Sequence, residues 1–358
     1  MLIQSDMNNN YLYILIFGCQ FFIYNLDAQI GGKHSYEFLN LPASARQTAL
    51  GGHIVSVMDE DVTIAGSNPA SLNGKMNNRI SFSHNFHFAG VQNGYFGYGK
   101  EISKWKLNTH FAIQYINYGE FTYTDVLGNQ QDKFSVKETA IIIGAGKKIA
   151  DRLYAGINLK TVFSNPESYS SIGALMDMGI NYRNDSSNFI ITFLVKNVGY
   201  ELTTYTGERS GTPLDIQIGL SKKLKYLPFR FSVIAQQLQT ANVRYDDPNK
   251  KVQTDIFGDP VTVSSFAESV DNIFRHLVFS GEFMLGKNEN LRLRAGYNHL
   301  LRKELSVSTF RSLAGFSLGF GIKVNVFKLD YGVGYHHVAG ATNHISISTD
   351  LGKFFKNI

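Results

Sequence analysis

The sequence predicts an all-β protein, a transmembrane antiparallel β-barrel of about fourteen strands. From about residue 79 onward, apolar and polar residues alternate in segments of about ten residues or more, the length that a tilted strand needs to cross a bilayer. Glycine (33) and aromatic residues (13%) are plentiful and proline (7) is scarce, a composition that favours strands and turns. Beyond the N-terminus no apolar run reaches the ~18 residues of a transmembrane helix, and β-strands remain as the way to span a membrane.

The alternation places each strand along the chain. In 105–116, for example, Phe111 and Ile113 share one face, whereas His110 and Gln114 share the other. An even number of such segments suits a single-chain bacterial barrel. The expected strands cover 79–88, 91–101, 105–117, 135–147, 152–164, 171–182, 188–199, 213–223, 229–239, 277–286, 291–301, 312–324, 326–338 and 343–352.

The connections between these strands sort into two kinds. Every second one is short, near 102–104, 148–151, 183–187, 224–228, 287–290 and 325. Longer ones cover 118–134, 165–170, 200–212, 240–276 and 302–311. Short turns at one end and long loops at the other are typical of outer-membrane barrels, whose long loops face outward. We therefore expect an integral outer-membrane protein with 118–134 and 240–276 as external loops.

Residues 1–28 have the pattern of a signal peptide. Tyr11 to Tyr24 is mostly apolar, and Leu26-Asp27-Ala28 resembles a small-residue cleavage site. No Lys or Arg precedes the apolar run, and a single N-terminal anchor is the alternative. The only cysteine, Cys19, lies in this segment, so an exported chain would contain neither disulfides nor thiol ligands.

The stretch "AIIIGAGKKIADRLYAGINLK" at 140–160 allows a second interpretation. An apolar run that ends in Gly-Ala-Gly is part of a dinucleotide-binding fingerprint. That fingerprint requires a third glycine followed by a helix, whereas this chain has Ile149 there and then resumes strand alternation at Leu153. The sequence therefore favours two strands joined by a turn from Lys147 to Arg152.

Residues 29–78 precede the barrel, predicted over 79–358, and lack its alternation. They contain a Gly-Gly pair, an acidic "MDED" stretch and the motif Asn68-Pro69-Ala70. This arrangement resembles the start of FadL-type outer-membrane proteins, the long-chain fatty acid transporter superfamily. The resemblance implies a fourteen-stranded barrel whose mouth is closed by this N-terminal hatch, with Asn68, Pro69 and Ala70 as its motif. An ordinary turn before a strand is the alternative.

A narrower resemblance covers essentially the whole mature chain. "GGKHSYEFLNLPASARQTALGG" at 31–52, "SNPASLN" at 67–73 and "AGKKIADRLYAGINLK" at 145–160 are similar to the PorQ family, barrel proteins of the type IX secretion system in Bacteroidetes. The resemblance implies a non-catalytic anchor that holds a PorZ-like surface protein and supports attachment of cargo to lipopolysaccharide. The alternative, from the wider superfamily, is an outer-membrane transporter of hydrophobic small molecules.

No residue pattern predicts catalysis, a cofactor, a metal site or a nucleic-acid partner. Adjacent strand residues such as His336 and His337 point to opposite faces and cannot ligate one ion. The Asp59-Glu60-Asp61 stretch could bind a cation, but we favour a solvated acidic turn. We expect Asp177 and Asp330 to face the lumen, where polar side chains belong.

The 240–276 loop contains a predicted helix. Ser265 and Glu268 fit a capping box, and Phe266, Val270, Ile273 and Phe274 follow at helical spacing. This apolar stripe could pack on the barrel rim, which we favour, or contact a partner. The candidate partner-contact residues of the loop are Arg244, Tyr245, Phe257 and Phe266.

Overall fold

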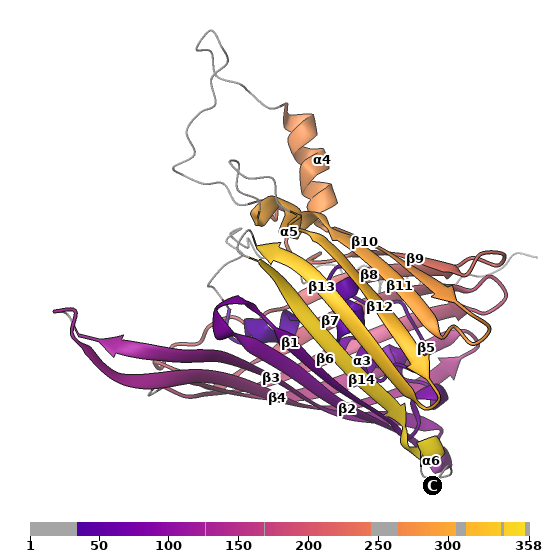
Figure 1. The fold of residues 1–358 in the computed structure, drawn as a ribbon, viewed down its shortest axis with the longest axis horizontal. Coiled ribbons are helices and arrows are strands. Elements are labelled where there is room, and N and C mark those ends of the chain that lie inside the picture. Colours follow the sequence, from indigo (N-terminus) through magenta and orange to yellow (C-terminus); the bar gives the residue numbers. More distant parts are fainter. Residues whose placement is uncertain are drawn as a thin grey trace, which may run out of the picture.

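Fourteen antiparallel strands form one closed barrel in the computed structural model of the chain, which describes residues 34–125, 127–167, 169–244, 264–305, 313–337 and 340–354 (Figure 1). Each strand pairs with its neighbours in chain order, and β1 pairs with β14 to close the wall. The predicted fourteen-stranded barrel is confirmed. No helix in the described ranges is long and apolar enough to cross a membrane. The strands are β1 Arg79–Phe86, β2 Gln92–Ile102, β3 Leu107–Thr124, β4 Gln130–Ala150, β5 Leu153–Pro166, β6 Ser171–Asn184, β7 Phe189–Thr203, β8 Asp215–Lys223, β9 Phe229–Ala235, β10 Leu277–Leu285, β11 Leu291–Asn298, β12 Phe316–Val324, β13 Phe327–His337 and β14 Gly340–Asp350.

The two faces of the barrel wall differ in polarity. On β14, Ile345 and Ile347 point outward and are exposed, whereas His344 and Ser346 point inward and are buried. Other strands repeat this arrangement, with exposed outward side chains such as Ile143, Leu159, Phe193, Leu318 and Leu329. An apolar exterior around a polar interior is the surface of a barrel that spans a bilayer.

The predicted external loop at 118–134 is wrong, because most of it is strand. β3 runs to Thr124 and β4 begins at Gln130, so the pair extends beyond the rest of the wall as a two-stranded ribbon (Figure 1). Phe121 pairs with Phe134 across this ribbon, and their rings stack at 5.5 Å. Such cross-strand aromatic pairs stabilise a ribbon by a few tenths of a kcal/mol to about 1 kcal/mol.

Residues 34–78, here called the plug, lie inside the barrel (Figure 1). The plug consists of short helices: η1 Glu37–Asn40, α2 Ala45–Ala49, α3 Thr63–Ser67, η2 Pro69–Ser71 and η3 Gly74–Met76. Polar side chains cap α2 and η2, since Ser44 accepts the Gln47 N–H and Asn68 accepts the Ala70 N–H. α2 packs against β11–β14, whereas η2 packs against β4–β6, so the plug contacts opposite parts of the wall.

Glycines in the wall let the plug backbone approach closely. A Cβ added to Gly332 of β13 would lie 2.2 Å from the carbonyl oxygen of Ala45 in α2. A Cβ on Gly156 of β5 would lie 2.3 Å from the carbonyl oxygen of Pro69. Both separations are far below van der Waals contact, so at these two positions the plug backbone fits only against a residue without a side chain.

We expect Gly332→Ala to displace α2 and to destabilise the protein by about 1–3 kcal/mol, the usual effect of overpacking. Gly340→Ala is the matched control, because a Cβ at Gly340 meets nothing within 4 Å. Thermal unfolding in detergent and tryptic cleavage after the buried Arg46 measure the two effects. Equal behaviour of the two variants would contradict the close seating of α2.

Candidate functional site

Arg46 of the plug joins α2 to the barrel wall and to the acidic segment of the plug. Its side chain is fully buried and forms two parallel bonds with Glu282 of β10, Nε to Oε1 at 3.1 Å and Nη2 to Oε2 at 2.9 Å. Nη2 also lies 2.8 Å from Asp59 Oδ2, and Nη1 lies 3.2 Å from Asp61 Oδ2. A bidentate guanidinium–carboxylate pair fixes geometry as well as charge.

The ion pairs continue along the wall. Glu282 also contacts Arg230 of β9 at 3.0 Å and Arg294 of β11 at 2.8 Å, and Arg294 reaches Asp330 of β13 at 2.6 Å. We call the connected set the ion-pair network. It comprises seven cations, Arg46, Lys223, Arg230, Arg292, Arg294, Lys323 and Lys328, and six carboxylates, Asp59, Glu60, Asp61, Glu282, Glu289 and Asp330.

The plug members of the network are held in their charged forms. Burial by itself lowers the pKa of Arg46, but the carboxylates of Asp59, Glu282 and Asp61 outweigh it and raise that pKa well above its ordinary value. Burial raises the pKa of Asp59, and the guanidiniums of Arg46, Arg292 and Arg230 more than reverse the effect. The expected solvated turn at Asp59-Glu60-Asp61 is therefore wrong, because cations from distant strands enclose these carboxylates.

The Asn68-Pro69-Ala70 motif lies at the opposite side of the plug. Asn68 is fully buried, its Oδ1 accepts the N–H of Ala70 at 3.0 Å, and its Nδ2 donates to Val55 O at 2.6 Å. Nδ2 also donates to Oδ1 of Asn181 on β6 at 3.0 Å. Asn68 thus joins two parts of the plug to each other and to the wall.

The inward face of β3–β6 is apolar next to the start of the plug. Ile116, Ile142, Val162 and Leu175 are buried there together with Ala112 and Ala140, and we call them the lumenal apolar patch. Tyr36, Phe38 and Leu39 of the plug pack in the same cluster. Alternation along single strands does not show that neighbouring strands place apolar inward residues side by side.

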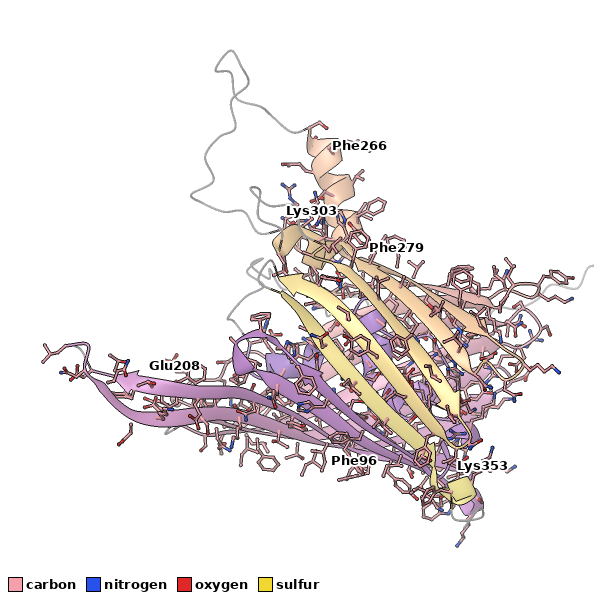
Figure 2. All side chains as sticks on the ribbon, viewed as in Figure 1. Phe96, Glu208, Phe266, Phe279, Lys303 and Lys353 are labelled. Atoms are coloured by element: carbon pink, nitrogen blue, oxygen red, sulfur yellow. The ribbon has the colours of Figure 1, made fainter. Side chains whose placement is uncertain are left out.

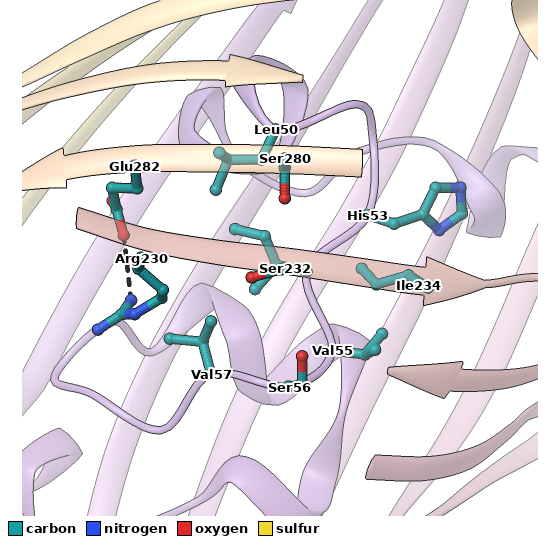
Figure 3. Close-up of a pocket in the computed structure, with 11 residues that line it drawn as sticks. Leu50, His53, Val55, Ser56, Val57, Arg230, Ser232, Ile234, Ser280 and Glu282 are labelled. Carbon is teal, nitrogen blue, oxygen red and sulfur yellow. Dashed lines mark hydrogen bonds and ion pairs between the residues drawn. The ribbon is translucent and has the colours of Figure 1, made fainter. Parts of the chain in front are cut away.

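Two cavities lie between the plug and the part of the wall that includes β8–β11. The first, of about 10 Å³, lies between residues 50–57 and β9–β10, with His53 at one end and the Arg230–Glu282 pair at the other (Figure 3). Burial lowers the pKa of His53 to about 4 and leaves its ring neutral. The second, of about 200 Å³, lies at the short-turn end and is lined by polar side chains including Lys223, Arg230 and Arg292.

Phe266, another sequence-based candidate, lies outside the barrel in α4, Ser265–Arg275. The predicted helix is confirmed, but its cap is Ser264 rather than Ser265, because Ser264 Oγ accepts the Ala267 N–H. Phe266 is 77% exposed at the end of α4 that lies away from the strands (Figure 2), so the favoured packing on the rim is wrong for this residue.

The base of α4 is held by polar contacts. Burial raises the pKa of Asp271, but hydrogen bonds from Lys303, Arg275 and His299 outweigh it and hold that pKa below its ordinary value. Arg244 Nη2 lies 3.0 Å from Glu268 Oε1, which joins the preceding segment to the helix. Tyr245 and Phe257 lie outside the described residues.

The last sequence-based predictions concern lumenal aspartates and possible metal ligands. Asp177 and Asp330 face the lumen as expected, and Asp177 pairs with Lys160 at 2.8 Å. Within the described ranges no group of three His, Cys, Asp or Glu side chains is arranged to hold a metal ion. The side chains of His336 and His337 lie outside the described part of the chain.

The depressed pKa of Asp59 gives the stability of the plug a defined pH dependence. A carboxyl with a lower pKa in the folded than in the unfolded chain contributes stability above its ordinary pKa, here 3.8, and that contribution is lost as the pH falls through the folded value. We expect Asp59→Asn to be less stable than the parent at pH 7 by about 3 kcal/mol, as when one partner of a buried pair is removed.

The difference between the parent and Asp59→Asn should shrink as the pH falls below 4. Thermal unfolding at pH 7, 5 and 3 measures it, and subtracting the variant removes the titration of the other carboxylates. A difference that stays constant over this range would contradict the ionic role of Asp59.

No protein-family model and no curated protein matches the chain, whereas solved structures match its fold. One match is TodX of Pseudomonas putida, described as a toluene transporter. The structure of its deltaS2 mutant, described as a monoaromatic hydrocarbon channel, is 11% identical over 87% of this chain and 98% of that chain, with a TM-score of 0.52. The CymD monoaromatic hydrocarbon channel matches with 11% identity over the same shares and a TM-score of 0.51. A FadL homologue of Pseudomonas aeruginosa matches at 9% identity over 86% and 98%, with a TM-score of 0.48. The chain therefore has the fold of the TodX and CymD barrels.

Proposed function

We propose that this protein is an outer-membrane channel for small hydrophobic molecules, closed in this structure by its plug. The lumenal apolar patch carries the proposal. An apolar surface inside a polar lumen is unfavourable unless something apolar covers it, and here Tyr36, Phe38 and Leu39 do so. A hydrophobic molecule could take their place when the start of the plug moves.

Fold similarity supports the same function. The structures matched at TM-scores of 0.52 and 0.51 are described as monoaromatic hydrocarbon channels, and the apolar exterior of the barrel suits an integral membrane protein. We further propose that the long-loop end lies outside the cell and the short-turn end in the periplasm, as is usual for outer-membrane barrels.

Passage through the lumen requires the plug to move. The cavity between residues 50–57 and β9–β10 is only about 10 Å³, near the lower limit for a single water molecule. Hydrogen bonds and ion pairs hold the plug there, and such contacts can break and re-form without chemical change.

A reversible cross-link between plug and wall tests this requirement. The Cβ of Ser56 lies 3.3 Å from the position of a Cβ on Gly219 of β8, close to the ~3.5–4.5 Å of a disulfide. The chain has no cysteine other than Cys19, so Ser56→Cys with Gly219→Cys should form one defined bond once the Val55 side chain turns aside.

We expect cells that rely on this protein for toluene uptake to lose uptake when the double variant is oxidised and to regain it on reduction. The single-cysteine variants are the controls. Uptake that is unchanged in the oxidised double variant would rule out a moving plug, and no uptake by the parent chain would rule out the channel function itself.

A second function, anchoring of a surface partner as in the PorQ family, is favoured by α4. Phe266 and Ile273 are 77% and 60% exposed, and no residue of the helix is buried. Isolated exposed apolar residues are common, but an exposed apolar stripe on a projecting helix is typical of a protein-binding surface.

We expect Phe266→Ser with Ile273→Ser to release a surface protein that otherwise copurifies from outer membranes, while the barrel still inserts. Leu127→Ser is the matched control, because Leu127 is 83% exposed in the β3–β4 turn. Quantitative mass spectrometry of the purified complexes measures the loss. Retention of the partner by the double variant would contradict the anchor function.

A further inference from the structure

We infer that the 200 Å³ cavity at the short-turn end is a binding site for an oxyanion, a phosphate or carboxylate group, held by Arg292. The cavity lies where the plug residues Asp59 and Glu60 face the ends of β8, β9 and β11. This site does not depend on the proposed channel function.

The charges of the ion-pair network do not balance. Its seven cations meet only six carboxylates among the described residues, and most of these side chains are buried. A buried charge is costly unless an opposite charge is near. One further negative charge would complete the network.

Arg292 is the guanidinium of the network that lacks a close partner. Its side chain is only 6% exposed, yet its nearest carboxylate oxygens, on Glu60 and Glu289, lie 3.5 Å from Nη2. Asp59 Oδ2 lies 3.8 Å from Nη1, which has no hydrogen bond within the described structure. Well-formed pairs of this kind measure about 2.7–2.9 Å.

The other guanidiniums of the network are better paired. Arg46, Arg230 and Arg294 each contact a carboxylate at 3.0 Å or less. The three carboxylates around Arg292 are also engaged elsewhere, since Asp59 pairs with Arg46, Glu289 contacts Lys223, and Glu60 lies 3.5 Å from Lys323. Arg292 therefore keeps a donor for a further acceptor.

The cavity offers room and donors for that acceptor. Its volume of about 200 Å³ equals that of several water molecules at ~30 Å³ each, enough for a phosphate or carboxylate group. Five cations line it, against four carboxylates. The cations are Lys75, Arg183, Lys223, Arg230 and Arg292, and the carboxylates are Asp59, Glu60, Asp185 and Glu289. A guanidinium fork matches the geometry of two oxyanion oxygens.

The position of the site predicts how anion binding affects the stability of the plugged barrel. Arg292 belongs to the wall, whereas Asp59 and Glu60 belong to the plug. An anion that offsets the excess positive charge lowers the repulsion among the cations gathered around the plug. Binding should therefore stabilise the plugged barrel.

Titration of the detergent-solubilised full-length mature chain with inorganic phosphate tests the inference. At constant ionic strength, with chloride as the balancing ion, we expect saturable binding of one phosphate per chain by calorimetry and a matching rise in Tm. Arg292→Gln should weaken binding at least tenfold, and Arg292→Lys less. Lys148→Gln, which removes an exposed turn cation outside the cavity, should bind as the parent does.

Lys223→Gln is the second variant if Arg292→Gln fails to fold, because Lys223 is 36% exposed and tolerates replacement; it should weaken binding at least threefold. Parallel titrations with acetate, and Tm in nanodiscs of phosphatidylglycerol against phosphatidylcholine, distinguish a free carboxylate or phosphate from a lipid headgroup. Binding of phosphate or acetate, or a rise in Tm with phosphatidylglycerol, supports the site if replacement of Arg292 or Lys223 weakens it. Weak, unsaturable effects of every anion, equal in parent and variants, would overturn it.

Discussion

The bidentate pair between Arg46 and Glu282 is the interaction on which the closed barrel depends. A fully buried arginine on a short plug helix is stable only because a wall carboxylate and two plug carboxylates surround it. Glu282 in turn needs Arg46, Arg230 and Arg294. Removal of one member leaves an opposite charge buried and unpaired, which costs about 3–5 kcal/mol. Plug and wall therefore stabilise each other.

The main interactions between plug and wall differ on the two sides of the plug. Towards β9–β13 it forms its ion pairs, and glycines of β12 and β13 bring α2 close to the wall. Val55 of the plug also packs against Ile234 and Val278 there. Towards β3–β6 its first residues cover the lumenal apolar patch. Under the proposed function both sets of contacts must give way, because the start of the plug covers the patch and the ion pairs hold the rest of the plug against β9–β13.

The sequence predicted the strands far better than the site. Strand alternation is a local signal, and so the fourteen strands could be located within a few residues. The partners of Asp59 could not, because Arg230 and Arg292 follow it by more than 150 residues and meet it only when the barrel closes. The β3–β4 ribbon was missed because its polar and aromatic residues also suit a loop. The shift from Ser265 to Ser264 at the α4 cap reflects two adjacent residues of equal capping ability.

The central claim is that the Arg46 pairs keep the lumen closed. Conductance of the purified barrel in planar bilayers tests this claim most directly. The parent chain should conduct little, and Arg46→Glu should conduct strongly because like charges then meet at Asp59 and Glu282 and expel the plug from its seat. Arg46→Lys should keep much of the closed state, since a positive charge still faces Glu282, Asp59 and Asp61. Equal conductance in all three proteins would contradict the account.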